Sequence, residues 1–186
     1  MTNQYNEIME LVPESFTSGK LQYCIMTMDD TEIVVNLRNA EHVRNNYIYQ
    51  KPITVEEHTN YFRTKIETGQ ILQYIMKEAN TGDAIGCAFL KDINLSDRIA
   101  EFGVFIGDKN ALGKGYGVDA VSQMKWLAFD KLKLDKLILR VLSYNGVAYN
   151  IYKKAGFFEV SREFEENAEA NNPREIILME FISERG

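Results

Sequence analysis

The sequence predicts an α/β fold of the α+β kind, in which a mixed, mainly antiparallel central sheet of about seven strands is flanked by helices. Three extended runs, "QILQYIMKEA", "AIGCAFLKDIN" and "IAEFGVFIG", follow one another between residues 70 and 107. The turns that separate them, "NTGD" and "LSDR", are short enough for hairpins. Segments with helical periodicity precede and follow this meander, so we expect helices to cover its apolar strands.

The length of 186 residues fits one domain. A chain of this size buries about 70% of the surface that its unfolded form exposes, which is enough for a sizeable core. We expect a single domain over residues 1–186, with residues 1–19 as an N-terminal extension and a core over about 20–182.

A short helix and a strand are expected first. Four residues recur at i, i+3, i+4 and i+7, namely Tyr5, Ile8, Met9 and Val12. This spacing predicts a short helix that ends before Pro13, as an appendage to the core. The run "LQYCIMTM" at 21–28 then has the composition of a strand.

Two helices are expected after this strand. Asp29 or Asp30 is placed to cap the first of them. Beyond a loop with Pro52, Thr54 and Glu57 have the spacing of a capping box. The second helix should therefore run through "TVEEHTNYFRTKIETG" and stop at Gly69.

The C-terminal part alternates helices and strands. A helix is predicted after the glycine-rich stretch at 113–117, because its apolar residues follow helical spacing: Val118, Val121, Met124, Leu127, Ala128 and Leu132. The strand "KLILRVLS", the helix "NGVAYNIYKKAG" and the strands "FFEVSREFE" and "REIILMEFI" complete the order.

Composition excludes several classes of protein. The net charge is −6, so a nucleic-acid-binding face, which would be basic, is not expected. No apolar run approaches the roughly 20 residues that span a bilayer, and the first residues lack a signal sequence, so we expect a cytoplasmic protein with no membrane contact. Cys24 and Cys87 lie in apolar runs without metal-ligand spacing, and we predict buried, reduced thiols and no metal site.

Gly113, Gly115 and Gly117 lie within five positions at the start of a helix. Such a stretch lets the backbone approach a ligand closely, and the free N–H groups of the helix start favour a phosphate. A P-loop is excluded because Gly113-Lys114 is not followed by Ser or Thr. A dinucleotide fingerprint is excluded because Val118 stands at the third glycine and the preceding strand belongs to a meander.

The motif "LGKGYG" after "AEFGVFIG", with "NGVAYNIYKKAGF" following the next strand, resembles the GNAT superfamily of N-acetyltransferases over about residues 20–182. The resemblance implies acetyl-CoA as cosubstrate, with its pyrophosphate on the backbone of a Q/R-x-x-G-x-G/A loop. The corresponding residues here are Leu112, Gly113, Lys114, Gly115, Tyr116 and Gly117. Leu112 departs from the pattern, because Gln or Arg is usual there. The resemblance further implies that pantetheine adds to the backbone of Val104, Phe105 and Ile106.

Glu101 is the candidate general base. Alternation places Glu101, Gly103 and Phe105 on one face of their strand, and the family often has a glutamate here. An amine with a pKa near 10.4 is neutral only about once in a thousand at neutral pH, so a base would help catalysis. The alternative is a strand carboxylate paired with Arg or Lys.

Tyr152 corresponds to a tyrosine that many members of the family keep near the coenzyme sulfur. There it would hydrogen-bond the departing thiolate; the alternative is core packing with Tyr149, three residues away. Asn145 is expected to cap its helix, and the resemblance also places an asparagine here near the cofactor.

The acceptor site is expected in "LRNAEHVRNNYIYQKPITVEEHTNYF", where the family shapes its acceptor pocket. The candidate substrate-binding residues are Arg38, Asn39, Tyr47 and His58. They look like those of the branch that acetylates amino-sugar nucleotides or the N-termini of ribosomal proteins. For Arg38 a surface salt bridge is the alternative, and for His58 a buried structural role.

We therefore predict direct acetyl transfer to a primary amine of a small molecule, with an amino-sugar nucleotide as the first candidate. A peptide N-terminus or a polyamine is the alternative acceptor. Glu165, Glu166 and Glu169 would either attract such a cation or be solvated charges of a turn. A non-catalytic coenzyme A-binding regulatory module is the alternative of another class. The resemblance also suggests a homodimer.

Overall fold

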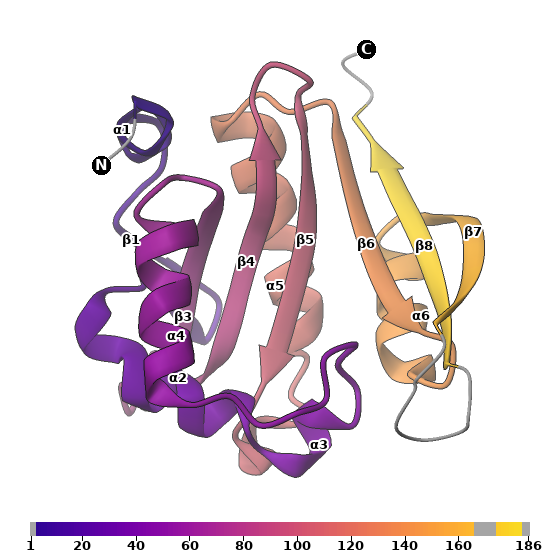
Figure 1. Cartoon of the computed structure of the whole chain (residues 1–186), viewed down its shortest axis with the longest axis horizontal. Helices are drawn as coiled ribbons and strands as arrows, with labels where there is room; N and C mark the ends of the chain where they lie inside the picture. Colours follow the sequence, from indigo (N-terminus) through magenta and orange to yellow (C-terminus); the bar gives the residue numbers. More distant parts are fainter. Residues whose placement is uncertain (1–2, 166–173, 184–186) are drawn as a thin grey trace.

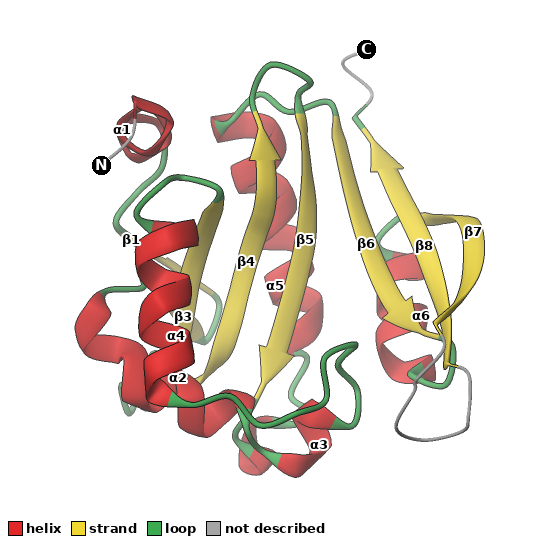
Figure 2. Cartoon of the chain, in the orientation of Figure 1, coloured by secondary structure: helices red, strands yellow, loops and turns green. Residues whose placement is uncertain are grey.

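The computed structural model describes residues 3–165 and 174–183, which form one eight-stranded sheet with helices on both faces (Figure 1, Figure 2). The strand order is β1-β2-β3-β4-β5-β6-β8-β7. All neighbouring strands are antiparallel except β5 and β6. The predicted mixed, mainly antiparallel sheet is confirmed, with eight strands in place of about seven.

The additional strand lies near the N-terminus. β1 (Ser15–Ser18) pairs with β2 (Leu21–Ile25). Its sequence "SFTS" has one apolar residue, Phe16, so period-2 alternation was too short to predict it. Phe16 stacks on Tyr23 of β2 with ring centroids 4.8 Å apart, which fixes this edge strand on the core.

The predicted N-terminal helix is α1 (Asn3–Leu11), but it is not an appendage. Ile8 is 2% exposed and belongs to the larger of the two hydrophobic clusters. The Gln4 side-chain amide donates to the carbonyl oxygens of Gly69 and Ile93 at 2.8 and 3.0 Å. These contacts attach α1 to parts of the chain more than 60 residues away, which local periodicity could not indicate.

The predicted capping box is confirmed at the start of α4 (Val55–Tyr61). The Glu57 N–H donates to Thr54 Oγ1 at 3.1 Å, and the Thr54 N–H donates to Glu57 Oε2 at 2.8 Å. A π-helical stretch over Phe62–Ile66 continues α4 toward Gly69.

Asp30 caps a different turn from the one predicted. Its Oδ2 accepts a 2.8 Å hydrogen bond from the Thr27 N–H, which closes a 3₁₀ turn over Met28–Asp30 before α2 (Thr31–Arg38). The Asp30 side chain makes no cap hydrogen bond to α2 itself. The short α3 (Glu41–Arg44) follows α2.

The meander consists of β3 (Ile71–Glu78), β4 (Ala84–Asn94) and β5 (Ile99–Ile106). The side chains of β5 alternate between the two faces of the sheet as predicted: Phe102 packs in the larger hydrophobic cluster, and Phe105 packs in the smaller one. Figure 1 shows α2 and α4 on the face of the sheet toward the viewer and α5 on the other. Each cluster therefore fills one side of the sheet.

The C-terminal elements follow the predicted order. They are α5 (Tyr116–Trp126) with a π-helical continuation over Leu127–Lys131, β6 (Lys136–Leu142), α6 (Gly146–Lys154), β7 (Phe158–Glu165) and β8 (Arg174–Ile182). β6 pairs with β5 only between residues 99–101 and 136–138. Beyond this point the two parallel strands diverge, and the functional site lies in the opening.

Candidate active site

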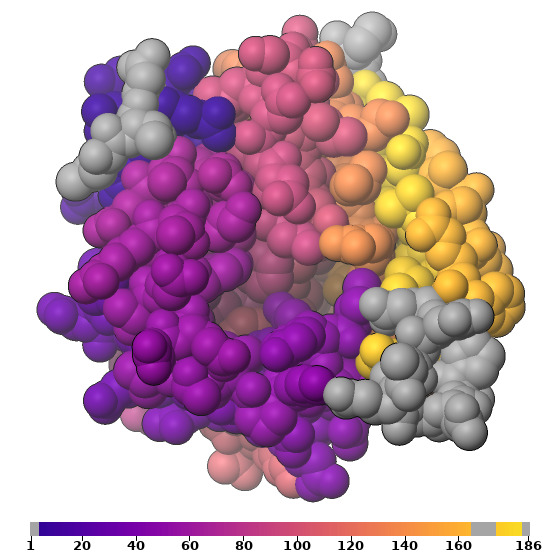
Figure 3. Space-filling model, viewed as in Figure 1, coloured from indigo at the N-terminus to yellow at the C-terminus, as the bar shows by residue number. Residues whose placement is uncertain are grey.

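A cavity of about 840 Å³ occupies the divergence between β5 and β6. Its walls are β5 from Glu101 to Ile106, parts of the glycine loop, residues between Arg140 and Tyr152, and a segment over 42–49 that includes part of α3. Figure 3 shows a hollow on this face between the purple segment around α3 and the pink and orange strands. Elements far apart in sequence thus supply one site.

The glycine loop at 112–117 forms one end of the cavity. Gly113 and Gly115 have φ values of +75° and +84°, a left-handed conformation that favours glycine. Gly115 is the N-cap of α5. The amides of residues 113–117 have no hydrogen-bond acceptor among the described residues, whereas those of Val118 and Asp119 donate to the Gly115 carbonyl. Consecutive free amides at a helix N-terminus fit an anion such as a pyrophosphate.

The acidic residue in the first turn of α5 does not oppose an anion at this loop. The Asp119 carboxylate faces the β1–β2 hairpin, where it accepts hydrogen bonds of 2.7 Å from Ser18 Oγ and from the Tyr23 hydroxyl. Burial and the nearby carboxylate raise the pKa of Tyr23, so its hydroxyl stays a donor. This network also ties the start of α5 to the sheet.

The predicted loop residues divide into two groups. Leu112, Gly113 and Gly117 line the cavity. The side chains of Lys114 and Tyr116 instead reach Glu78 at the end of β3, with Lys114 Nζ and the Tyr116 hydroxyl 2.8 and 2.9 Å from Glu78 Oε1. These contacts lower the pKa of Glu78 and raise that of Lys114. Lys114 is thus paired rather than merely solvated, and it anchors the loop to β3.

The predicted backbone contacts on β5 do not all face the cavity. The Gly107 N–H donates to the Ile85 carbonyl oxygen of β4. Backbone groups along a strand point alternately to its two neighbours, so the Phe105 backbone also faces β4, whereas the backbones of Val104 and Ile106 face the opening. His42 Nε2 lies 2.9 Å from the Ile106 carbonyl oxygen. The free edge therefore consists of the Val104 backbone and the Ile106 N–H.

Glu101 lies at the point where β5 and β6 separate, and it is 8% exposed. Arg140 binds it with two hydrogen bonds, Nε to Oε1 at 3.2 Å and Nη2 to Oε2 at 3.1 Å. Lys91 Nζ lies 3.0 Å from Oε1. A carboxylate has about four lone-pair sites, so one site on Oε2 remains for a further donor. The structure therefore contains the ion pairs of the alternative interpretation, and it leaves Glu101 one site at which to accept a hydrogen bond from a ligand or a water molecule.

Tyr152 of α6 lines the cavity beside the same end of β5, with its ring 5.9 Å from that of Phe102 in a perpendicular arrangement. Burial raises the pKa of Tyr152 to about 12. Its hydroxyl has no hydrogen-bond partner among the described residues. At neutral pH it is consequently a protonated donor available to a ligand.

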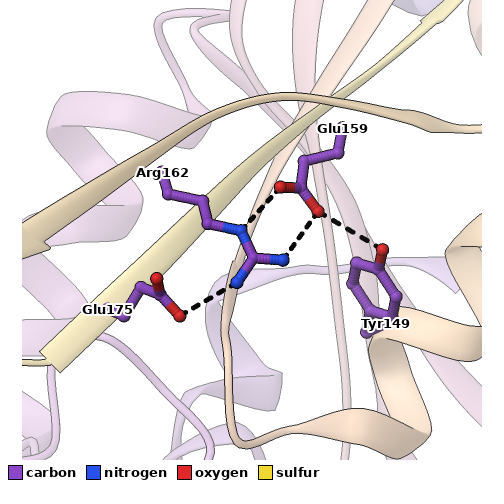
Figure 4. Close-up of polar contacts among 4 residues, drawn as sticks. All are labelled: Tyr149, Glu159, Arg162 and Glu175. Atoms are coloured by element: carbon purple, nitrogen blue, oxygen red, sulfur yellow. Dashed lines mark hydrogen bonds and ion pairs between the residues drawn. The ribbon is translucent and has the colours of Figure 1, made fainter.

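Two contacts fix α6 beside the cavity. The Asn145 side chain caps the helix by accepting from the Ala148 N–H at 3.3 Å, as predicted, and Asn145 also lines the cavity. On the other side, the Tyr149 hydroxyl lies 3.3 Å from Glu159, which Arg162 binds through two hydrogen bonds (Figure 4). Tyr149 thus faces β7, and only Tyr152 faces the cavity.

The four predicted acceptor-site residues lie at different depths. Tyr47 lines the cavity, and the Arg38 guanidinium carbon lies 3.6 Å from the centroid of its ring. Arg38 is buried, donates to the Tyr49 carbonyl oxygen at 2.6 Å, and has a lowered pKa because of burial. It forms no salt bridge with a described residue and does not reach the cavity, so it supports the tyrosine wall from behind.

Asn39 and His58 also lie away from the cavity. The Asn39 side chain donates to the Ile53 carbonyl and accepts from the Ile53 N–H, both at 2.8 Å, and so closes the loop after α2. His58 is 5% exposed inside α4, and burial lowers its pKa. Both positions fit structural roles. Glu166 and Glu169 lie outside the described residues.

The sequence reasoning missed several residues of the cavity wall, namely His42, Lys91, Arg140 and Tyr144. Lys91 and Arg140 are isolated cations inside apolar strands, in "AFLKDI" and "LILRVL", and this pattern was a signal. Tyr144 donates to the Asn45 carbonyl oxygen at 2.8 Å across the cavity mouth. Neither Tyr144 nor His42 stands in a pattern that predicts its place.

Other classes of site are not seen in the described ranges. No group of three or more His, Cys, Asp or Glu side chains there could hold a metal ion. No helix there has both the length and the apolar character needed to cross a bilayer.

The comparisons with known proteins agree with this geometry. The family model described as "Acetyltransferase (GNAT) domain" matches residues 25–158, which is most of the chain. A search of curated proteins finds no match. Similar solved structures include the spermidine N-acetyltransferase of Vibrio cholerae in complex with CoA and spermine, with a TM-score of 0.80 and 23% identity over 89% of this chain and 96% of that one.

A dodecameric structure of the Vibrio cholerae enzyme has a TM-score of 0.74 and 23% identity, and it covers 89% of this chain and 95% of the other. At this identity the likeness shows the fold. The family match supplies the activity, and the free amides and open strand edge are suited to the coenzyme. The chain therefore belongs to the GNAT acetyltransferases, enzymes that use acetyl-CoA as their cosubstrate.

Proposed function

We propose that this acetyltransferase moves the acetyl group directly to a primary amine of a small molecule. The observation that carries the proposal is one continuous cavity, with free amides at 113–117 at one end and both Glu101 and Tyr152 at the other. When bound, acetyl-CoA supplies an acetyl group activated as a thioester. The loop amides would hold its pyrophosphate, and the Val104 backbone its pantetheine arm.

Glu101 would act on the amine. The attacking amine must be neutral, yet an alkyl ammonium has a pKa near 10.4, so a positioned proton acceptor is required. Glu101 Oε2 keeps one site for this proton, directly or through a water molecule. Lys91 and Arg140 hold the carboxylate in place by their contacts with its oxygens.

Tyr152 would donate a hydrogen bond to the thiolate that leaves. We expect Tyr152→Phe to lower kcat about tenfold while the affinity for acetyl-CoA stays within twofold, since one hydrogen bond to a charged group is removed. Burial raises the pKa of Tyr152 to about 12, so the phenol is protonated below that pH. The activity of the unmodified protein should thus show no loss from Tyr152 ionisation up to about pH 11. A kcat unchanged in Tyr152→Phe would contradict this role; Tyr149→Phe is the control, because Tyr149 faces β7.

The acceptor has two main candidates. The similar solved structures described above are of a spermidine N-acetyltransferase. This likeness favours a polyamine, although at 23% identity it supports only the fold. The amino-sugar nucleotide predicted from sequence remains a proposal, and a peptide N-terminus is a further acceptor to test. The assay is thiol release from acetyl-CoA with spermidine, an amino-sugar nucleotide and a short peptide, each product being identified by mass spectrometry.

Each outcome of this panel has a consequence. Acetylation of any of the three supports the proposed transfer and identifies the acceptor class. Coenzyme A binding without acetylation of a broad set of amines would instead support the regulatory module. Absence of both binding and transfer would refute the assignment of the cavity.

A further inference from the structure

The cavity wall carries an excess of positive charge at the end where β5 and β6 meet. Among the described residues that line it, two cations, Lys91 and Arg140, accompany a single carboxylate, Glu101. Lys91 stands directly opposite Glu101 on β4. On β6, Ile138 is the partner of Glu101. Arg140 stands two positions further along β6 and therefore points to the same face as Ile138, so Lys91, Glu101 and Arg140 share one face of the sheet.

Both cations retain hydrogen-bond donors. Arginine has five N–H donors, and Arg140 uses Nε and Nη2 on Glu101. Lysine has three, and Lys91 makes one ion pair, also with Glu101. Their side chains are 26% and 42% exposed for Lys91 and Arg140, against 10% for Glu101. The two cations are therefore more exposed than the carboxylate that they bind, and they are accessible to a further partner.

Coenzyme phosphates do not account for this excess. The free amides for the pyrophosphate lie at 113–117, beyond the far end of β5. Ile106 is five positions after Glu101 along β5, a span of roughly 16 Å at about 3.3 Å per residue. The cations stand at the opposite end of the cavity from that loop, where the acceptor amine must meet Glu101.

Lys91, Glu101 and Arg140 lie on the face of the sheet that α2 and α4 cover elsewhere. Figure 1 shows α2 and α4 in front of β3 and its neighbours, whereas β5, β6 and β8 have no helix drawn in front of them. Lys91 on β4 and Arg140 on β6 are the charged side chains of these two strands that line the cavity in the part of the chain that the structure describes.

We propose that Lys91 and Arg140 determine acceptor specificity by binding an anionic group, a phosphate or a carboxylate, carried by the amine substrate. This inference rests on the proposed transfer reaction and names its substrate class. The cluster has a net charge of +1, so it repels a linear polycation such as spermidine and attracts an anion. If this inference is right, the acceptor that this protein prefers differs from that of the structurally similar spermidine N-acetyltransferase.

The test compares matched amines that differ in one anionic group. Glucosamine 6-phosphate against glucosamine tests a phosphate, and an α-amino acid against its amide tests a carboxylate; spermidine is the polycation. We expect kcat/KM to be at least about tenfold higher for the anionic member of one pair. Lys91→Met and Arg140→Gln should each reduce that ratio about tenfold, because a ratio of two amines is not affected by a loss of turnover common to both.

The matched control is Lys136→Met, since Lys136 is a cation on the same face that pairs with Glu180 and does not line the cavity. In Lys136→Met the ratio of kcat/KM between the matched amines should equal that of the unmodified protein. The affinity for coenzyme A should stay within twofold in all three variants. The inference would be overturned if the ratio of kcat/KM between the anionic amine and its matched partner were the same in the Lys91 and Arg140 variants as in the unmodified protein. A preference of the unmodified protein for spermidine would also overturn it. So would a loss of coenzyme A affinity with the ratio unchanged.

Failure of the transfer reaction would be distinguishable. Calorimetric titration of each amine into the protein saturated with coenzyme A measures acceptor binding without turnover. Tighter binding of the anionic member, lost in Lys91→Met, would support the inference even if no acetyl group were transferred, while the proposed function would then fail. Acetylation of an amine without any preference for the anionic member of a pair would support the proposed function and refute the inference.

Discussion

Gly115→Asp should lower the affinity for coenzyme A by on the order of 100-fold or more, the largest binding effect that we expect. Gly115 caps α5 with φ +84° between free amides. A carboxylate there opposes a pyrophosphate by like-charge repulsion, and a penalty of about 2.7 kcal/mol already corresponds to 100-fold. The measurement is thermal unfolding with coenzyme A, since ligand at 100 times Kd adds about 2.7 kcal/mol of stability to the unmodified protein.

A matched control separates backbone strain from loss of the site. Gly82, in the β3–β4 turn, also has a left-handed backbone, with φ +78°, and an added Cβ meets no atom within 4 Å at either position. Each substitution costs about 1–2 kcal/mol of strain. Gly82→Asp should keep the stabilisation by coenzyme A, because Gly82 does not line the cavity. Equal affinity in Gly115→Asp and the unmodified protein would remove the pyrophosphate site from this loop.

Glu101→Gln should lower kcat about 10²- to 10⁴-fold, the usual contribution of general base catalysis. The amide keeps the shape of the side chain and cannot take the amine proton. Acetyl-CoA affinity should change little, because the loop amides and the Val104 edge lie elsewhere. Steady-state kinetics with the best acceptor from the panel give kcat, and coenzyme titration gives the affinity.

The ion pairs of Glu101 make a structural control necessary. Glu180 on β8 pairs with Lys136 on the same face of the sheet, so Glu180→Gln removes a comparable carboxylate outside the cavity. We expect its kcat to stay within about threefold. If Glu101→Gln lowers the melting temperature but leaves kcat within that range, Glu101 is only the partner of Lys91 and Arg140, and another group must remove the proton.

Local sequence patterns determined most of the fold and the coenzyme end of the site. The meander follows from apolar runs between short turns, and the Thr54–Glu57 box marks α4. Gly113 and Gly115 stand where the backbone is left-handed, and Asn145 stands where α6 begins. Periodicity, caps and turns depend on neighbours within a few residues, so one sequence suffices to locate them.

The acceptor end was decided by the tertiary structure. Arg38 and Asn39 are adjacent polar residues at the C-terminal end of α2, yet Arg38 supports the ring of Tyr47 and Asn39 closes a loop through Ile53. Lys91 and Arg140 surround Glu101 only because of the register of three strands up to 49 residues apart in sequence. A one-residue change of register would turn each side chain to the other face. The sequence by itself therefore specified the elements and the phosphate loop, whereas strand register and long-range packing decided which charges meet the substrate.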